Sequence, residues 1–484
     1  MMNISFPITI FGGILAAGTS CNPAMSLNER KPNIVFILAD DLGYSELGCY
    51  GNRFNETPNI DNLAKNGIRF TQAYSSAPVS SPYRAALMTG QYPARIGITD
   101  YLRPNSANFL DTNYVTLPEA LRYNGYHTGI IGKWHLTGHL HNNAPTEIPP
   151  EKQGFNEVMS SETIGIGNGT YFHPYHFNPE LEKKLPGEKE FLIDRMNFEA
   201  VDFIERNYKE PFFLYLSHYA VHTMLHGKPE EVEYFRKKGK SGTSTFSKEN
   251  PDDDPYKKWP SDYFASRNNP HLAAQLKTVD DGIKMICNKL RELRIEDNTI
   301  IIFSSDNGGE TRVTSNFPLR EGKSTLYEGG IREPLIVYQP GNIRGGRVSD
   351  YVTANYDLYP TICELTGTEL PGNQFIDGIS LVHVLKGKNP DAQDTHTLYW
   401  HYPLQTKHFL GGRSSGAIRE GEWKLIEFFD TGERELYNLN NDIGETTNLL
   451  QQNPEKAKEL EEKIEKWRTN VLNRPFKTGG TDRR

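Results

Sequence analysis

Carboxylate and amide side chains follow two apolar segments of this sequence. Asp40 and Asp41 come directly after one apolar run, and Asp306 and Asn307 come shortly after another. Oxygen atoms from such side chains are the ligands that Ca²⁺ and Mg²⁺ prefer in proteins. Clustered cysteines and suitably spaced histidines, which Zn²⁺ would require, are missing from the sequence. These residues therefore predict a site for one divalent cation.

Basic and proton-donating side chains follow two further apolar runs. Lys133 and His135 follow the second run, His218 and His222 follow the third, and Lys323 lies further along the chain. Lysine and histidine groups around a divalent cation suit a tetrahedral anion, because its charge must be held while a group is transferred. The predicted chemistry is therefore the transfer of an anionic group.

Ser80 lies just ahead of a helix that starts at Pro82, and no general base accompanies it in the sequence. Its hydroxyl is either a nucleophile or a cap for the first N–H groups of that helix. Ser81 and Pro82 already have the pattern of an N-cap followed by a first helical residue. The positive end of this helix is expected to point toward the predicted cation site.

Each of these residues also has a purely structural explanation. An aspartate pair after a strand is more often a turn or a helix cap than a ligand pair, and Asp-Asn-Gly-Gly is a good turn sequence. A single histidine near a strand end is usually a satisfied polar residue, and a lysine there can be solvated. Ligands of open α/β sheets bind beyond the carboxyl ends of the strands, however. The coincidence of all these side chains at one sheet edge favours a functional site.

The elements that must position this site form an α/β fold. Near-continuous apolar runs alternate with helical patterns, which predicts a mostly parallel sheet buried on both faces by helices. The expected strands lie within residues 33–39, 129–131, 212–216 and 299–304, and the expected covering helices are residues 58–65 and 271–290.

The sequence pattern changes after residue 378. We expect a main domain at residues 31–378 and a smaller α+β domain at 379–484, with antiparallel strands and one amphipathic helix. The expected strands of the smaller domain lie within 417–428 and 435–438, and its helix at 454–471. Two polar segments, 160–188 and 237–260, are expected to be long loops.

The chain has 484 residues, 37% of them hydrophobic, which is enough to bury a large core. A net charge of −8 without long charged runs argues against a nucleic-acid-binding protein. Residues 1–21 have the pattern of a signal peptide, and no other segment reaches transmembrane length. Lipid attachment at Cys21 and simple cleavage both remain open. The expected location is the periplasm or the outer-membrane-anchored surface of a Gram-negative bacterium.

The remaining cysteines, Cys49, Cys287 and Cys363, are too few and too scattered to form a disulfide framework or a metal site. We expect them to be buried apolar residues.

Several motifs, taken in order, resemble those of a known family. Residues Ser80 to Arg84 match the five-residue signature (Cys or Ser)-x-Pro-x-Arg, in which x is any residue. The chain resembles the type I sulfatases of the alkaline-phosphatase superfamily over nearly its whole length. The other matching segments are 31–43, 132–135, 305–309, 318–323, 326–332 and 435–439.

In that family the first signature residue is oxidised to formylglycine (3-oxoalanine), whose hydrate attacks the sulfur atom of a sulfate ester. The resemblance implies that oxidised Ser80 is the nucleophile, which would explain why no base accompanies it. It further implies a calcium ion bound by Asp40, Asp41, Asp306, Asn307 and modified Ser80. The implied catalytic roles are Arg84 holding the formylglycine, Lys133 and Lys323 gripping sulfate oxygens, His135 assisting elimination and His222 protonating the leaving alcohol.

Three residues depart from the family pattern. Tyr83 replaces the commonest serine of the signature, Glu321 replaces a frequent glycine, and Met224 stands where proline is usual. The last departure makes the position of His222 less secure and leaves His218 as a weaker candidate. A serine-type signature also implies a bacterial maturation enzyme that acts on Ser80 before export.

The resemblance to bacterial glycan sulfatases predicts an O-sulfated galactose or N-acetylgalactosamine of a host or algal polysaccharide. Residues that are candidates to line the sugar pocket are His173, His176, His218, Glu328, Arg347 and His401. Surface-loop aromatics and structural ion pairs explain these residues equally well.

Two alternative functions remain open. A phosphatase or phosphonate hydrolase of the same superfamily would require a second metal and more ligands. A non-catalytic protein that binds sulfated glycans would result if Ser80 stays a serine.

Overall fold

A mixed sheet of nine strands lies at the centre of the computed structural model, which describes residues 30–165, 171–239, 264–388 and 396–473. Strands β4, β3, β5, β1 and β6 are parallel neighbours in that order, whereas β7 runs antiparallel to β6 and β2. This arrangement confirms the predicted mostly parallel α/β sheet. Its strands are β1 Asn33–Ala39, β2 Ile68–Tyr74, β3 His127–Gly132, β4 Glu157–Met159, β5 Phe212–Ser217, β6 Thr299–Ser305, β7 Arg332–Tyr338, β8 Arg347–Ser349 and β9 Thr353–Ala354.

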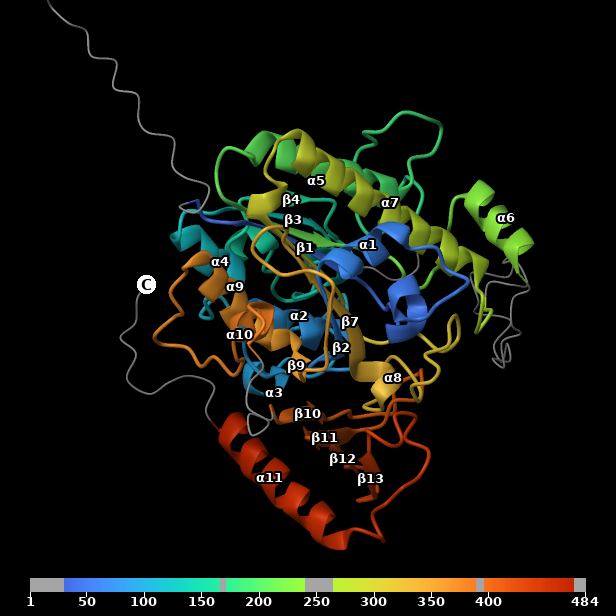
Figure 1. Ribbon diagram of the computed structural model, residues 1–484, viewed down its shortest axis with the longest axis vertical. Coiled ribbons are helices and arrows are strands. Elements are labelled where there is room, and N and C mark those ends of the chain that lie inside the picture. Colours follow the sequence, from blue (N-terminus) through green and yellow to red (C-terminus); the bar gives the residue numbers. More distant parts are fainter. Residues whose placement is uncertain (1–29, 166–170, 240–263, 389–395, 474–484) are drawn as a thin grey trace, which may run out of the picture. The chain divides into compact units, whose positions relative to one another are not determined.

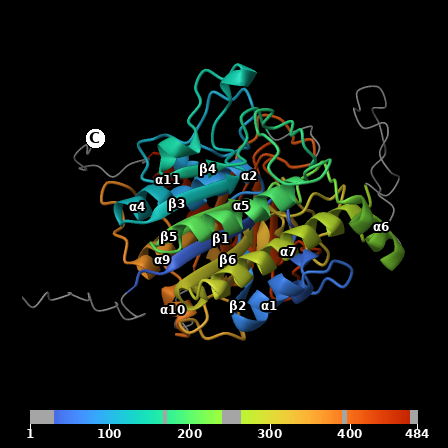
Figure 2. The ribbon, with the colours of Figure 1, turned by 90° about the horizontal axis from the view of Figure 1, so that it is seen from above.

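Helices cover both faces of this sheet, as Figures 1 and 2 show. The side chains of β1 alternate between the faces. Val35 and Ile37 pack with residues of α1, α5 and α7, whereas Ile34 and Phe36 pack with residues of α2, α4 and α9. Burial on both faces explains why the strand reads as a continuous apolar run.

The helices agree with the sequence patterns where those patterns were strongest. The helices expected at 58–65, 271–290 and 454–471 are present, each within two residues of the expected ends. The α-helices are α1 Pro58–Asn66, α2 Ser80–Thr89, α3 Pro93–Ile96, α4 Leu117–Tyr123, α5 Leu192–Asn207, α6 Pro229–Lys238, α7 Pro270–Glu292, α8 Glu328–Ile331, α9 Leu358–Thr366, α10 Val382–Leu385 and α11 Pro454–Leu472.

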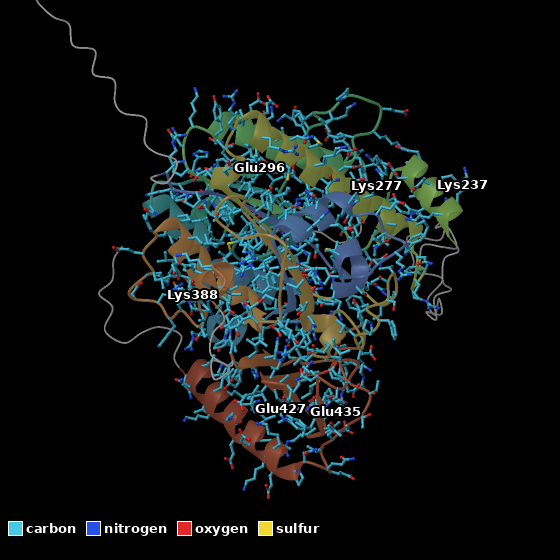
Figure 3. All side chains as sticks on the ribbon, in the orientation of Figure 1. Lys237, Lys277, Glu296, Lys388, Glu427 and Glu435 are labelled. Carbon is cyan, nitrogen blue, oxygen red and sulfur yellow. The ribbon has the colours of Figure 1, made fainter. Side chains whose placement is uncertain are left out.

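A second, antiparallel sheet has the order β10-β11-β12-β13 and comes from the C-terminal part of the chain. Helix α11 covers one face, where Leu460 and Ile464 pack on Ile418 and Leu425. The other face packs on the main sheet's elements, with Trp400 against Tyr74. Figure 3 shows side chains such as Glu427 and Glu435 projecting from this second sheet. Its strands are β10 Leu398–Tyr402, β11 Ser415–Glu420, β12 Trp423–Phe428 and β13 Arg434–Asn438.

From Lys31 onward the described chain packs as one compact unit, so the boundary at 378/379 stays a prediction. The predicted loop at 160–188 contains neither helix nor strand in its described part, and most of the loop at 237–260 lies outside the described residues. The predicted signal peptide, with Cys21, also lies outside them. Within the described ranges, no helix is both long and apolar enough to cross a membrane.

The cysteines expected to be buried are only partly so. Cys363 is buried, whereas Cys49 and Cys287 are half-buried, and all three are free thiols.

Candidate active site

The carboxyl ends of four neighbouring strands bring the predicted residues together. Ala39, the last residue of β1, pairs with Ser305 at the end of β6, and Gly132 at the end of β3 pairs with Ser217 at the end of β5. Because β1 lies between β5 and β6, the residues that follow all four strands emerge at one edge. The sequence prediction of a shared sheet edge is therefore confirmed.

Three carboxylates form a buried cluster at this edge. One ligand oxygen from each of Asp40, Asp41 and Asp306 lies within 4.8 Å of the others, and all three residues are at most 2% exposed. The backbone N–H of Asp41 donates to Asp306 Oδ1 at 3.1 Å, and Asn307 Nδ2 donates to Asp41 Oδ1 at 2.8 Å. A converging set of buried, purely oxygen donors fits a hard divalent cation such as Ca²⁺ or Mg²⁺.

A buried lysine and a half-buried one flank two of these carboxylates. Lys133 Nζ lies 2.6 Å from Asp40 Oδ2, and Lys323 Nζ lies 2.6 Å from Asp41 Oδ2. Burial alone would raise the pKa of both aspartates, but Lys133 beside Asp40 and Lys323 beside Asp41 outweigh it and hold each pKa below its usual value. The carboxylates of Asp40 and Asp41 therefore stay ionised, as metal ligands must be.

Arg84 ties three parts of this edge together. Its guanidinium donates to Asp306 Oδ2 at 2.8 Å, to the Lys133 carbonyl at 3.0 Å and to Ser217 Oγ at 2.5 Å. The side chain is 1% exposed. Arg84 thus fixes the end of β6 against the ends of β3 and β5 from its place in α2.

Ser80 begins α2 and points into the cluster. Its Oγ lies 3.2 Å from Asp40 Oδ1, 3.0 Å from Lys133 Nζ and 3.5 Å from Asn307 Oδ1. The residue before α2 is Val79, so the expectation that Ser81 and Pro82 open the helix was wrong by two residues.

Neither serine hydroxyl caps α2. Ser81 Oγ accepts the Leu102 N–H at 2.9 Å instead. Among the described residues, no histidine contacts Ser80 Oγ, so the environment of this hydroxyl is carboxylate, amide and ammonium. The hydroxyl of Ser80 is thus held at the carboxylate cluster, and it has no histidine partner among the described residues.

Two histidines lie beside this group with assignable proton positions. His222 Nδ1 contacts the Thr223 carbonyl, which places the proton on Nδ1 and leaves Nε2 facing Asp41 Oδ2 at 3.7 Å. His135 Nε2 contacts the Leu102 carbonyl at 2.9 Å, and its buried Nδ1 has no hydrogen-bond partner among the described residues. Burial and the charges of Lys133 and Arg84 hold the pKa of His135 well below its usual value, so the ring is neutral.

Sequence reasoning missed Glu162, which organises the turn that carries Lys133 and His135. Its carboxylate accepts the backbone N–H groups of Trp134 at 3.0 Å and His135 at 2.5 Å, and the Tyr219 hydroxyl at 3.0 Å. It is 7% exposed. His135 has a positive φ of 56°, and Glu162 holds that conformation in place. Glu162 lies in a segment whose composition indicated only a loop, so no sequence signal identified it.

The proposed sugar-binding residues are not brought together. Glu328 is 0% exposed and ion-paired with Lys424 at 2.9 Å and Arg332 at 3.1 Å, so it belongs to a buried charge network and is closed to a sugar. Arg347 donates to the backbone carbonyls of Val384 and Leu385. These two residues have structural roles that explain them without a ligand.

The four histidines of that prediction have separate surroundings. His401 lies beside Phe429, with a ring separation of 5.4 Å, and His173 packs on Tyr175 at the same separation. His176 is exposed. His218 is 1% exposed with no hydrogen-bond partner for its ring among the described residues, and burial lowers its pKa to about 3. Their roles in sugar binding stay predictions.

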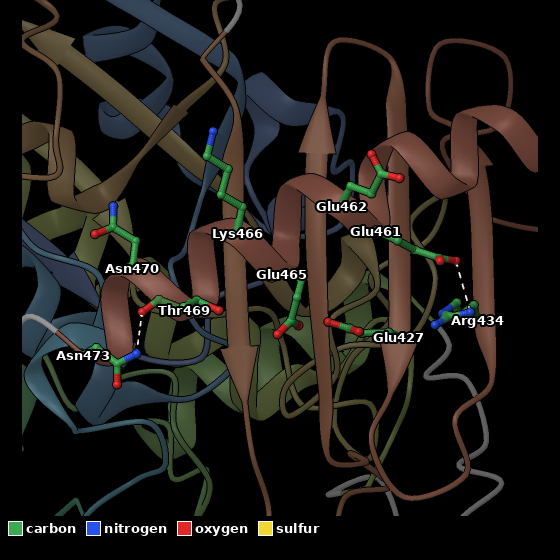
Figure 4. Close-up of a pocket in the computed structure, with 9 residues that line it drawn as sticks. All are labelled: Glu427, Arg434, Glu461, Glu462, Glu465, Lys466, Thr469, Asn470 and Asn473. Carbon is green, nitrogen blue, oxygen red and sulfur yellow. Dashed lines mark hydrogen bonds and ion pairs between the residues drawn. The ribbon is translucent and has the colours of Figure 1, made fainter.

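A large surface pocket of about 920 Å³ lies away from this edge, between α11 and the second sheet (Figure 4). Its lining includes Glu427, Glu461, Glu462 and Glu465, and none of the carboxylates of the buried cluster. This acidic hollow would repel an anionic substrate, so we place the chemistry at the sheet edge.

The fold and this site define a class. Residues 32–368 match the sequence profile of the sulfatase family, and residues 321–470 match that of the C-terminal part of N-sulphoglucosamine sulphohydrolase. The chain belongs to the sulfatase family and is a sulfuric ester hydrolase.

Individual relatives agree with this assignment. A protein named sulfatase from Formosa agariphila is 30% identical, covering 95% of this chain and 93% of the relative. An N-acetylgalactosamine-6-O-sulfatase from Bacteroides thetaiotaomicron is 29% identical, covering 97% of this chain and all of the relative. The crystal structure of Ps i-CgsB is similar with a TM-score of 0.73 and 31% identity, over 91% of this chain and 93% of that chain.

Proposed function

We propose that this sulfatase removes an O-sulfate group from a carbohydrate, with galactose or N-acetylgalactosamine as the sulfated sugar. The observation that carries the proposal is the convergence of Ser80, three carboxylates and two lysines at one sheet edge. The named N-acetylgalactosamine-6-O-sulfatase relative, and the Ps i-CgsB structure described in complex with k-i-k-neocarrahexaose, support a sulfated glycan as the substrate class.

The chain's own residues would act on the sulfate ester as follows. Lys133 and Lys323 would hold the non-bridging sulfate oxygens, since their ammonium groups flank Ser80 and Asp41. In its imidazolium form, with Nδ1–H on the Thr223 carbonyl and Nε2–H facing Asp41, His222 would give the Nε2 proton to the leaving alcohol oxygen and become a neutral ring protonated at Nδ1. His135 would accept a proton at Nδ1 during release of sulfate, because that atom is the unoccupied acceptor of a neutral ring.

Two groups complete this proposal. Oxidation of Ser80 to formylglycine, by a maturation enzyme acting before export, would supply a hydrated aldehyde as the nucleophile. One Ca²⁺ ion, held by Asp40, Asp41, Asp306, Asn307 and the modified Ser80, would lower the pKa of that hydrate and neutralise charge on the sulfate. Lys133, 3.0 Å from Ser80 Oγ, would keep the modified side chain oriented.

The test is sulfate release from a panel of sulfated galactose and N-acetylgalactosamine monosaccharides and oligosaccharides. The expected result is turnover by the wild-type protein, and loss of turnover with retained glycan binding in the Ser80→Ala variant. Turnover of phosphate or phosphonate esters in preference to all sulfate esters would contradict the proposal. Binding of sulfated glycans without turnover by fully oxidised protein would favour a binding role.

A further inference from the structure

We propose that a rim formed by Tyr101, Arg103, Arg312, His408 and Phe409 binds a second, anionic sugar unit next to the one whose sulfate is removed. This proposal rests on the proposed function and extends it to an oligosaccharide substrate with at least two acidic groups. Three segments that are far apart in the sequence contribute to the rim, and each contacts a proposed catalytic residue or the residue next to one.

The first segment, residues 101–103, is fixed to the nucleophile helix and to His135. The Leu102 N–H donates to Ser81 Oγ at 2.9 Å, directly beside Ser80. The Leu102 carbonyl contacts His135 Nε2 at 2.9 Å. Tyr101 and Arg103 flank Leu102 in sequence, so their side chains start next to the reacting groups.

The second segment is fixed to the loop of His222. Glu310 accepts the Thr223 hydroxyl at 2.9 Å, and Thr223 follows His222. Arg312 is ion-paired with Glu310. This pairing places the Arg312 guanidinium beside the part of the site from which the leaving alcohol would depart.

The third segment, residues 408–412, lies in the loop between β10 and β11 and contacts Ser324, the neighbour of Lys323. Its backbone closes on itself, because the His408 N–H donates to the Gly412 carbonyl and the Gly411 N–H donates to the His408 carbonyl, both at 2.8 Å. A side chain at Gly412 would lie 1.9 Å from the carbonyl oxygen of Ser324, so the two backbones are in contact there. Ser324 follows Lys323, the second sulfate-binding lysine of the proposed mechanism.

The side chains of the three segments form a continuous stack. Arg103 lies over the Tyr101 ring at 4.6 Å, and Tyr101 packs edge-on against His408 at 5.6 Å. His408 stacks on Phe409 at 4.4 Å, and Arg312 lies over the Phe409 ring at 5.4 Å. Aromatic contacts thus connect the guanidinium group of Arg103 to that of Arg312.

Two of the five side chains in this stack are largely open to solvent. Phe409 is 68% exposed, and the Arg103 side chain is 57% exposed. A large exposed aromatic side chain held in a fixed loop is typical of a binding surface, and its flat face suits the apolar C–H face of a sugar ring. Arg103 has one ion pair, at 3.5 Å to Asp100, and a guanidinium carries five N–H donors, so it can also bind a ligand anion.

Two arginines of the rim lie near His408 together with Lys323, and each arginine also has a carboxylate partner. Burial lowers the pKa of His408 to about 4, helped by Lys323, Arg103 and Arg312 and opposed by Asp41, so the imidazole is neutral. Lys323 is already engaged at the cleaved sulfate in the proposed mechanism. Arg103 and Arg312 are additional to it, and they fit a sulfate or carboxylate on the adjoining sugar.

The experiment compares N-acetylgalactosamine 6-sulfate with a chondroitin 6-sulfate tetrasaccharide, in which the sulfated sugar adjoins a uronic acid. Arg103→Gln and Phe409→Ala are the rim variants. Arg122→Gln and Tyr123→Ala are matched controls, because Arg122 and Tyr123 are an exposed cation and a 76%-exposed aromatic on the surface of α4. Affinity for both probes is measured by calorimetry in the Ser80→Ala background, and kcat/KM is measured in oxidised protein.

We expect each rim variant to weaken tetrasaccharide binding by about 10-fold or more beyond its effect on the monosaccharide, as loss of a charge-assisted or stacking contact predicts. The controls should bind like the parent. The proposal would be overturned if the rim variants weakened binding of both probes equally or left the tetrasaccharide affinity unchanged. It would also be overturned if the parent protein did not bind the tetrasaccharide. Failure of the proposed function is separate, because it would appear as absent sulfate release while calorimetry still reports on the rim.

Discussion

Replacing Glu162 with glutamine removes one of the two acceptor oxygens that hold the turn of Lys133 and His135. The size of the side chain stays the same. In the native protein the Glu162 carboxylate accepts two consecutive backbone N–H groups and the Tyr219 hydroxyl. Glutamine offers one carbonyl oxygen, and its NH₂ group would face a donor. With its oxygen in the place of Oε1, glutamine would keep the His135 bond, but the Trp134 N–H would lose its 3.0 Å acceptor and retain only the 3.2 Å contact.

The magnitude follows from burial and from the number of bonds. A fully unsatisfied buried donor costs about 1–3 kcal/mol, so the free energy of unfolding should fall by at most that amount. The larger effect is expected on catalysis. The positive φ of His135 depends on these bonds, and a displacement of about 1 Å in a reacting group lowers a rate by about 100-fold. We therefore expect kcat to fall about 10- to 100-fold, with a smaller change in KM.

The assay is steady-state sulfate release, with kcat corrected for the fraction of oxidised Ser80 measured by mass spectrometry. Glu147→Gln is the matched control, because Glu147 and Glu162 line one surface cavity. Glu147 hydrogen-bonds His139 and the Leu140 N–H, and not the turn of Lys133 and His135. This control should keep its kcat. A Glu162→Gln protein with wild-type kcat, or an equal loss in the control, would refute the positioning role.

Three further predictions concern the buried charges. In the presence of a chelator, Lys133→Met should lower the free energy of unfolding, measured by denaturant titration, by about 3–5 kcal/mol, because Lys133 is 0% exposed and paired with Asp40. Adding Asp40→Asn to this variant should recover most of the lost stability. A loss below about 1 kcal/mol in Lys133→Met would argue against the buried pair. Calcium added to chelated protein should raise Tm, with about 2.7 kcal/mol of stabilisation at 100 times Kd, and Asp306→Asn should abolish the shift; an identical shift in that variant would exclude the site. Burial raises the pKa of Glu46 to about 7, above its unfolded value of 4.5. The folded state therefore binds the extra proton, and the free energy of unfolding should fall as pH rises from about 4.5 to 7. Glu46→Gln should flatten this pH dependence, and an unchanged slope in that variant would contradict the prediction.

The sheet edge could be predicted from the sequence because its residues follow strands directly. Asp40 and Asp306 are one residue beyond β1 and β6, so the apolar runs fix their place once parallel pairing is assumed. The start of α2 was misplaced because Pro82 is a strong helix-start signal, whereas the structure extends the helix back to Ser80 and uses the Ser81 hydroxyl for Leu102.

The residues that support and surround this edge could not be predicted. Glu162 acts through backbone N–H groups of a distant turn, and such bonds leave no pattern in side-chain type or spacing. The loop between β10 and β11 contributes His408 and Phe409 through long-range packing, which periodicity does not encode. The burial of Glu328 could not be predicted either, because its ion-pair partner Lys424 is distant in sequence. This buried pair gives Glu328 a structural role in place of the predicted contact with a sugar.

The mass of the peptide that contains Ser80 tests the formylglycine mechanism most directly. It should be measured in protein purified from cells that contain a serine-type maturation enzyme, alongside specific activity on a sulfated monosaccharide. We expect a peptide lacking two hydrogens relative to the serine form, with activity proportional to the modified fraction and absent in Ser80→Ala. Full sulfatase activity in protein whose Ser80 is entirely unmodified would contradict this mechanism.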